Sequence, residues 1–82
     1  MQLQTVDSSM LYAIGYDQAT QALEVVFHAG GIYRYERVPQ SVYDELMAAP
    51  SKGRYMRQHV FGQYSYRRLH RQRLGRRKRT RT

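Results

Sequence analysis

The sequence predicts a small α+β domain, an antiparallel sheet of three or four strands with two helices on one face. Three observations support this class. Apolar residues alternate with polar or small residues in three runs over the first half of the chain, which is the period of β-strands. Two later segments repeat their apolar residues at helical spacing. The 82 residues are enough for one domain only.

The first two strands are predicted on either side of a polar turn. In residues 10–16 large side chains stand at every second position, and in residues 23–28 Leu23 and Phe27 share one face. The polar residues 17–21 between these runs indicate a turn. We therefore expect two strands joined by this turn.

A glycine pair marks the next turn. Gly30 and Gly31 stand between two β-prone runs, which indicates a hairpin because both residues accept a positive φ. A third strand is therefore expected at residues 32–38. Arg34 and Glu36 share one face of that strand, so this face is expected to be solvated.

Two helices are predicted after the third strand. The first spans residues 40–49, whose apolar positions recur at helical intervals, and a proline ends it. The second spans residues 52–61, with Ser51 as its N-cap and a glycine at its end. One stripe of this second helix is expected to face the core, which places basic side chains on the opposite side. The stripe consists of Tyr55, Met56, His59 and Val60.

The rest of the chain divides into a short ordered segment and a tail. Residues 63–69 alternate once more and predict a final strand or extended segment. No apolar periodicity follows, because Leu69 and Leu74 are five residues apart and Gly75 comes next. The expected organisation is an N-terminal extension, a folded domain and a disordered Arg-rich tail, at residues 1–8, 9–69 and 70–82.

The charge of the chain is concentrated at one end. Nine of the fourteen Lys and Arg residues, and none of the six Asp and Glu, lie in residues 67–82. Residues 1–66 hold five basic and six acidic residues, a net charge of −1. Such a block of like charge repels itself and is best neutralised by a polyanion, of which nucleic acid is the commonest. The alternative is a solvated extension that only keeps the protein soluble.

The composition excludes several kinds of site. The chain has no cysteine, so disulfides, thiolate zinc sites and cysteine nucleophiles are excluded. His28, His59 and His70 lack metal-ligand spacing, so no metal or other cofactor is expected, and His59 is interpreted as half-buried in the core. Asp44 and Glu45 lie about 100° apart on a helix and do not converge as an acid–base pair. We therefore expect a protein that is not an enzyme.

The compartment is predicted from the same features. The N-terminal residues lack the basic start and apolar core of a signal peptide. No apolar run approaches the length needed to cross a bilayer. Together with the absence of cysteine, this favours a cytoplasmic protein without a membrane partner.

Tyrosine is overrepresented, with eight residues and no tryptophan. Four of them are expected to share the sheet: Tyr33, Tyr35, Tyr64 and Tyr66. If they line the face covered by the helices, they form core; if Tyr64 and Tyr66 stand on the open face, they would stack on bases beside the arginines that follow. We favour the core interpretation.

The segment Ser51-Lys52-Gly53-Arg54-Tyr55 is the one motif that could bind a phosphate. A hydroxyl, a lysine and backbone N–H groups at a helix start would suit a phosphate oxygen. The simpler interpretation is structural, in which Ser51 caps the helix and Gly53 allows close packing of its first turn. We favour the structural interpretation.

An ordered series of short motifs resembles the KTSC domain family, over residues 7–69. That family is named after its occurrence at the C-terminus of some lysyl-tRNA synthetases, and it also includes short free-standing bacterial and phage proteins. The resemblance implies a connection to nucleic acid only through the synthetase association, and it does not extend to the Arg-rich tail. The motifs are Ser8-Ser9, Ile14-Gly15-Tyr16-Asp17, Leu23-Glu24-Val25-Val26-Phe27, Gly31-Ile32-Tyr33-Arg34-Tyr35, Val38-Pro39, Val42-Tyr43, Ser51-Lys52-Gly53-Arg54-Tyr55 and Tyr64.

These observations lead to one leading hypothesis and one alternative. The first is a small non-catalytic module that binds nucleic acid, RNA ahead of DNA, mainly through phosphate contacts of the tail. The alternative is an adaptor or regulator that binds an acidic protein surface. Neither hypothesis involves a small-molecule substrate. The residues predicted to bind nucleic acid are Lys52, Arg54, Arg57, Tyr64, Tyr66, Arg67, Arg68, Arg71, Arg73, Arg76, Arg77, Lys78, Arg79 and Arg81.

Overall fold

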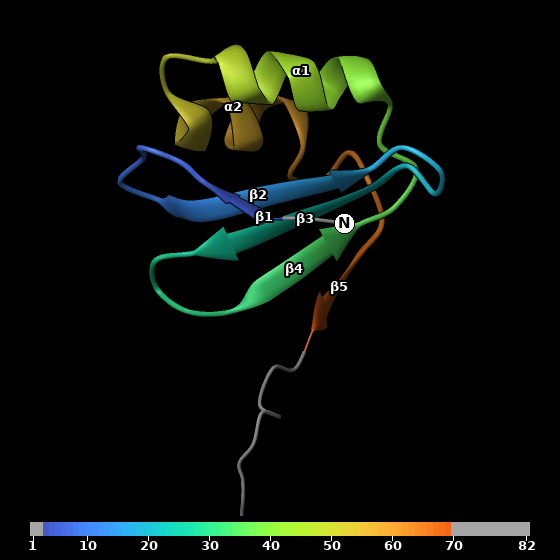
Figure 1. Ribbon diagram of the computed structural model, residues 1–82, viewed down its shortest axis with the longest axis horizontal. Helices are drawn as coiled ribbons and strands as arrows, with labels where there is room; N and C mark the ends of the chain where they lie inside the picture. The colour runs from blue at the N-terminus through green and yellow to red at the C-terminus, as the bar shows by residue number, and fades with distance from the viewer. Residues whose placement is uncertain (1–2, 70–82) are drawn as a thin grey trace, which may run out of the picture.

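A computed structural model describes residues 3–69 of the chain. Its strands form one antiparallel sheet in the order β1-β2-β3-β4-β5, and both helices lie on the same face of it (Figure 1). The α+β class, the antiparallel sheet, the two helices on one face and the final strand are as predicted. The tail expected to be disordered, at residues 70–82, lies outside the described residues. The elements are β1 (Leu3–Thr5), β2 (Leu11–Asp17), β3 (Ala22–Phe27), β4 (Ile32–Tyr35), α1 (Gln40–Ala48), α2 (Lys52–His59) and β5 (Tyr66–Leu69).

The sheet has one strand that the sequence did not predict. β1 lies within the stretch interpreted as an N-terminal extension, and it pairs with β2 so that Leu3 faces Gly15 and Thr5 faces Ala13. The amide of Val6 also donates to the carbonyl of Tyr12. β1 is only three residues long, and all three are exposed. A strand of that length and exposure has no apolar alternation that a sequence pattern could detect.

The glycine turn has the conformation that its residue types indicate. Gly30 and Gly31 have φ values of 99° and 102°, and the amide of Gly30 donates to the carbonyl of Phe27. This turn joins β3 to β4 as a hairpin. β4 ends at Tyr35 rather than at the predicted Val38, because Arg37 has a φ of 57° and takes the chain out of extended conformation.

The core lies between the helix-covered face of the sheet and the two helices. Its fully buried side chains come from both layers: Leu11, Ile14, Leu23, Val25, Tyr35, Val38, Leu46, Met56 and Val60. The hydroxyl of Tyr16 donates to the carbonyl of Val38, and the ring of Tyr16 stacks on that of Tyr43 on α1 at 4.9 Å between centroids. These contacts hold α1 over β2.

The start of α2 has the structural role that we favoured for its motif. Ser51 Oγ accepts a hydrogen bond of 3.3 Å from the amide of Arg54, which is the geometry of an N-cap. Gly53 is buried, and a Cβ placed on it would stand 3.0 Å from Sδ of Met10. Glycine therefore allows the first turn of α2 to approach the segment that enters β2.

Two details of the helices differ from expectation. α2 ends at His59 rather than Phe61, and His59 is exposed, with its ring 4.5 Å from that of Tyr55, rather than half-buried in the core. Glu45 of α1 accepts a 2.7 Å hydrogen bond from the hydroxyl of Tyr55, which ties α1 to α2.

Candidate nucleic-acid interface

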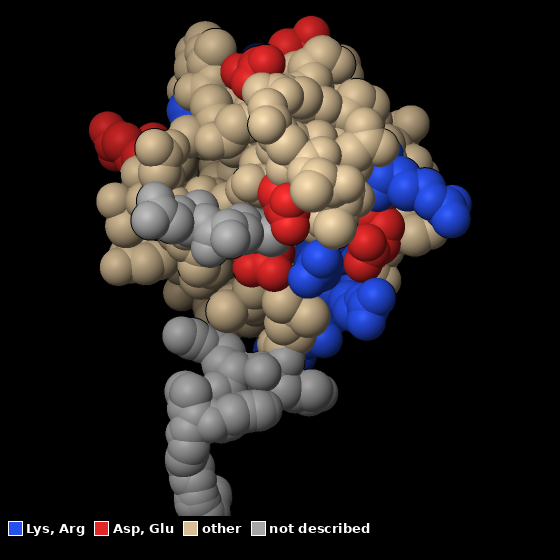
Figure 2. All heavy atoms as spheres, turned by 45° about the vertical axis from the view of Figure 1, so that its right-hand side comes forward, with Lys and Arg blue, Asp and Glu red and all other residues tan. Residues whose placement is uncertain are grey.

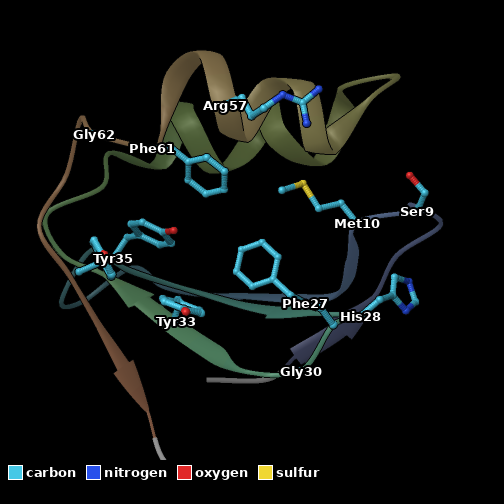
Figure 3. A pocket seen from close by; sticks show the side chains of 12 residues that line it. Ser9, Met10, Phe27, His28, Gly30, Tyr33, Tyr35, Arg57, Phe61 and Gly62 are labelled. Carbon is cyan, nitrogen blue, oxygen red and sulfur yellow. The ribbon is translucent and has the colours of Figure 1, made fainter.

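A groove of about 780 Å³ opens on the helix-covered side of the sheet. In Figure 1 the helices lie over β2 and β3, while β4 and β5 lie farther from them. Figure 3 shows the side chains of the lining residues, with Arg57 on α2 and Tyr33 on β4 on opposite sides. We call this space the aromatic groove. Its lining is Ser9, Met10, Phe27, His28, Ala29, Gly30, Tyr33, Tyr35, Arg57, Phe61, Gly62 and Tyr66.

Five aromatic rings of the groove contact one another in a continuous series. Phe27 meets Tyr33 edge-on at 5.4 Å and Phe61 at 6.3 Å between ring centroids. Tyr66 lies 5.7 Å from Tyr33 and 5.5 Å from Tyr35. Of these rings Tyr35 is only 3% exposed, whereas Tyr66 is 60% exposed. The series therefore runs from the core to an open aromatic surface at the edge strand.

Cations border the groove on two sides. Arg57 lines it from α2. Arg68 on β5 is not among the lining residues, but its guanidinium lies 6.0 Å from the ring centroid of Tyr33, which lines the groove, in cation–π geometry. Gly31 lies close to both side chains: a Cβ placed on it would stand 3.3 Å from Cε1 of Tyr33 and 3.4 Å from Nε and Nη2 of Arg68. No Asp or Glu is among the residues that line the groove. The groove thus combines ring surfaces with positive charge.

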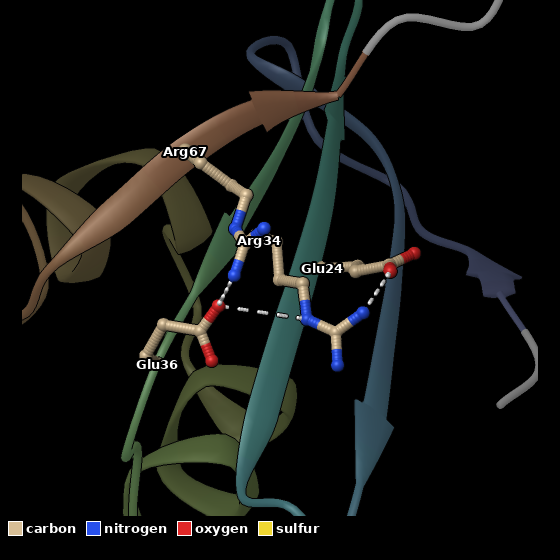
Figure 4. Close-up of polar contacts among 4 residues, drawn as sticks. All are labelled: Glu24, Arg34, Glu36 and Arg67. Carbon is tan, nitrogen blue, oxygen red and sulfur yellow. Dashed lines mark hydrogen bonds and ion pairs between the residues drawn. The ribbon is translucent and has the colours of Figure 1, made fainter.

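The neighbouring arginine of β5 lies on the opposite face of the sheet. Arg67 is paired with Arg34 in the register of β4 and β5, and its Nη2 is 3.4 Å from Oε2 of Glu36. Arg34 continues this series, at 3.7 Å from both Glu36 and Glu24 (Figure 4). The face turned forward in Figure 2 likewise shows basic and acidic side chains side by side below the helices. Arg67 is therefore partly neutralised and does not reach the aromatic groove.

Lys52 and Arg54 lie at the start of α2, outside the groove lining. Lys52 is half-buried, and its Nζ donates to the carbonyl of Ala49 at 3.1 Å. Arg54 is exposed and lines a smaller hollow of about 260 Å³. Arg57 lines both this hollow and the groove. Of the three α2 cations predicted to bind nucleic acid, Arg57 is the one that belongs to the groove.

The predicted tyrosines also separate. Tyr66 belongs to the aromatic groove, but Tyr64 is half-buried against the core and lines a different hollow with Glu36 and Arg37. Tyr35 is buried and Tyr33 is half-buried on the helix-covered face, as the core interpretation expected. Tyr66 shares that face but is 60% exposed, so the core interpretation is wrong for Tyr66. The remaining predicted cations lie outside the described residues: Arg71, Arg73, Arg76, Arg77, Lys78, Arg79 and Arg81.

The described chain ends beside the groove. Leu69 pairs with Ile32, directly after the glycine turn that includes Gly30 of the groove lining. The Arg-rich segment is therefore covalently joined to the molecule at one end of the groove.

Phe27 and Phe61 are groove residues that the sequence did not suggest. In the sequence both look like core residues. Phe27 continues the buried side of β3, and Phe61 follows the apolar stripe of α2. Both are only partly buried. Strand alternation could have placed Phe27 and Tyr33 on the same face of the sheet. The sequence does not show, however, where the helices stop covering that face.

The most buried tyrosine of the groove is neutral at ordinary pH. Burial raises the pKa of Tyr35 to about 12, and the adjacent phenols of Tyr66 and Tyr33 contribute to the shift in the same direction. Tyr35, which is only 3% exposed and keeps its proton, is not placed to act as a general base. The groups that line the groove are suited to stacking, hydrogen bonding and attraction of anions.

Residues 3–69 show neither a metal centre nor a membrane-spanning helix. No three His, Cys, Asp or Glu side chains in this range come together as a set of metal ligands. No helix in the same range is long and apolar enough to span a membrane.

The fold and the groove define a small α+β module with a five-stranded antiparallel sheet. The model of the KTSC domain matches residues 7–64, and the chain belongs to the KTSC domain family. A crystal structure of a KTSC domain protein from Yersinia pestis superposes with a TM-score of 0.82 at 37% sequence identity, covering 83% of this chain and 96% of that one. This likeness confirms both the family resemblance and the fold class.

Two kinds of relative share the domain. A small uncharacterized protein from Stutzerimonas stutzeri is 47% identical over 62 residues, which are 76% of this chain and 86% of the relative. A lysine–tRNA ligase from Nostoc sp. is 41% identical over 63 residues, which are 77% of this chain but 11% of the ligase. The chain therefore matches most of one relative and a minor part of the other.

Proposed function

We propose that this protein is a non-catalytic RNA-binding module whose affinity comes mainly from contacts between arginines and phosphates. The observation that supports the proposal is the charge distribution. Residues 1–66 have a net charge of −1, and the next sixteen residues contain nine cations and no anion. A guanidinium binds phosphate through two parallel hydrogen bonds, and eight of these nine cations are arginines.

The point at which the tail is attached, after Leu69 of β5, supports the same function. The cationic segment begins on β5, where Arg68 stands on the groove side, and Arg57 faces the groove from α2. A phosphate chain held by the segment after Leu69 would be close to these two cations. The tail and the groove rim can therefore contact one ligand together.

One comparison favours RNA over DNA. A lysine–tRNA ligase is, by its name, an enzyme of tRNA, and this chain shares a domain with it. The domain is a minor part of that ligase, so its contribution there is a matter for experiment.

Salt dependence tests the proposal directly. Binding of a dye-labelled RNA is measured by fluorescence anisotropy between 50 and 200 mM salt. If about six phosphates are engaged, the affinity falls by roughly a thousandfold over this range. Arg71, Arg73, Arg76, Arg77 and Arg79 are then replaced by Gln in the full chain. The slope of log affinity against log salt should decrease by about one for each of these arginines that binds a phosphate.

Other results of these measurements would contradict the proposal. A flat salt response, or an affinity unchanged by the five substitutions, would exclude phosphate binding by the tail. Tighter binding to DNA of the same sequence would overturn the assignment to RNA. Salt-sensitive binding to an acidic protein with no binding of RNA would support the adaptor alternative instead.

A further inference from the structure

We infer that the aromatic groove binds unpaired bases, so that this protein prefers single-stranded RNA to duplex RNA. The inference rests on the proposed function, because it takes RNA as the ligand. It adds a second binding element, made of the folded domain rather than of the tail.

The outermost ring of the groove is exposed to solvent. Tyr66 is 60% exposed on the last strand, although Tyr33 and Tyr35 lie within 5.7 Å of its ring. The exposure of the three rings decreases from Tyr66 at the open edge, through Tyr33, to Tyr35 inside the groove. An exposed ring supported from behind by other rings offers a rigid face on which a base can stack.

The charge around the groove is complementary to that of RNA phosphates. Arg57 and Arg68 border the groove from α2 and from β5, and no carboxylate lines it. The acidic side chains near β5, Glu36 and Glu24, pair with Arg34 on the other face of the sheet. A base stacked on the exposed ring of Tyr66 therefore leaves its flanking phosphates near positive charge and away from negative charge.

The size and the lining of the groove are suited to a base. The volume of about 780 Å³ lies in the range of sites that enclose small organic molecules, and five of the twelve lining residues are aromatic. In an RNA duplex the faces of the bases are stacked on one another and inaccessible, whereas unpaired bases can be splayed onto aromatic side chains. The groove therefore selects unpaired RNA, while phosphate contacts of the tail do not distinguish the two forms.

The chain offers two matched pairs of substitutions for the test. Tyr66→Ala removes the exposed groove ring, and Tyr12→Ala removes a ring of similar exposure, 50%, that is outside the groove lining. Arg68→Gln removes the cation beside Tyr33, and Arg67→Gln removes its sequence neighbour on the opposite face. Tyr66→Trp keeps an aromatic surface and serves as the rescue variant.

The measurement is the affinity for one short RNA, single-stranded or annealed to its complement. We expect Tyr66→Ala to weaken single-strand binding by about fivefold or more, since one stacked base contributes roughly fivefold to 150-fold. Duplex binding should stay unchanged. Tyr66→Trp should restore affinity, and Tyr12→Ala should have no effect. Arg68→Gln should weaken single-strand binding more than Arg67→Gln.

A second readout locates the base without relying on affinity. RNA that carries a photoreactive pyrimidine is irradiated with the full-length protein, and the crosslinked peptides are mapped. Crosslinks to Tyr33, Phe61 or Tyr66 support the inference. Crosslinks confined to residues 70–82 overturn it.

Failure of this inference and failure of the proposed function give different results. If Tyr66→Ala and Tyr12→Ala bind single strands equally, the groove is not a base site, although salt-sensitive binding through the tail still stands. If neither RNA form binds at low salt, the proposed function itself fails. If Tyr66→Ala only dissociates a dimer and leaves RNA affinity unchanged, the occupant of the groove is a second copy, and the inference is overturned.

Discussion

Arg67 and Arg68 are neighbours on β5, but their guanidinium groups lie on opposite faces of the sheet. Arg67 meets Glu36 at 3.4 Å, whereas Arg68 lies 6.0 Å from the centroid of the Tyr33 ring. Both begin the cationic segment, and the alternation predicted for residues 63–69 places them on opposite sides without showing what either side contacts. The alternation of a strand gives them different partners, and only Arg68 is available to the aromatic groove.

The ion pair of Arg67 should contribute little to stability. Both side chains are substantially accessible, and exposed pairs contribute about 0.2–1 kcal/mol. A double-mutant cycle with Glu36→Gln and Arg67→Gln, measured by urea unfolding, should give a coupling energy in this range. A coupling above about 2 kcal/mol would contradict this view of the pair. Lys52→Gln, on another element, is the control that should not couple to Glu36.

Ser51 should act as a helix cap and not as a phosphate ligand. Ser51→Ala removes the acceptor for the Arg54 amide and is expected to lower the free energy of unfolding by about 0.5–2 kcal/mol. Ser51→Asp keeps an acceptor and should stay near wild-type stability. If Ser51 instead contacted phosphate, the added carboxylate would weaken RNA binding strongly. We expect the RNA affinity of Ser51→Asp to stay close to that of the wild type in the same anisotropy assay.

Gly53 should be required for the packing of α2 on the segment before β2. Alanine gains about 1 kcal/mol of helix propensity over glycine, but its Cβ would lie 3.0 Å from Sδ and 3.3 Å from Cβ of Met10. Overpacking of this kind costs about 1–3 kcal/mol, so we expect Gly53→Ala to lower the stability by up to about 2 kcal/mol net. In a Met10→Ala background the same substitution should lose most of its penalty. Equal effects in both backgrounds, measured by thermal unfolding, would show that Met10 is not the obstacle.

Tyr35 should make the stability fall at alkaline pH. Its pKa is raised from 10.0 to about 12 by burial, so the folded chain keeps the proton at a pH where the unfolded chain has lost it. The contribution is complete below pH 10 and is lost as the pH rises toward 12. Tyr55 shifts in the same direction, by burial and by its bond to Glu45. Urea unfolding at several pH values should show a smaller alkaline decrease for Tyr35→Phe than for wild type; parallel curves would contradict the assignment.

Much of the fold could be predicted because its signals are local. The Gly30-Gly31 turn and the Ser51 cap each follow from the conformation that a residue type allows. β1 could not be predicted because its pairing partner, not its own sequence, makes it a strand. The end of β4 was misplaced because the φ of 57° at Arg37 belongs to a residue that seldom adopts it.

The candidate site was only partly predictable, for a different reason. The arginines were visible as charge, but charge alone does not tell which face of β5 a side chain takes or which acid it meets. Phe27 and Phe61 have the pattern of core residues, and they line a groove because two short helices do not cover the whole sheet. Coverage of this kind is a property of the packed molecule.

Within residues 3–69, β5 has a neighbouring strand on one side only, and it carries the exposed ring of the groove as well as the attachment of the Arg-rich segment. If these four residues separated from β4, the ring of Tyr66 would leave the groove, and the point at which the tail is attached would move with it. Ligand occupancy and closure of that sheet margin are thereby linked, and slowed amide hydrogen exchange along β4 and β5 would be the signature of a bound strand of RNA.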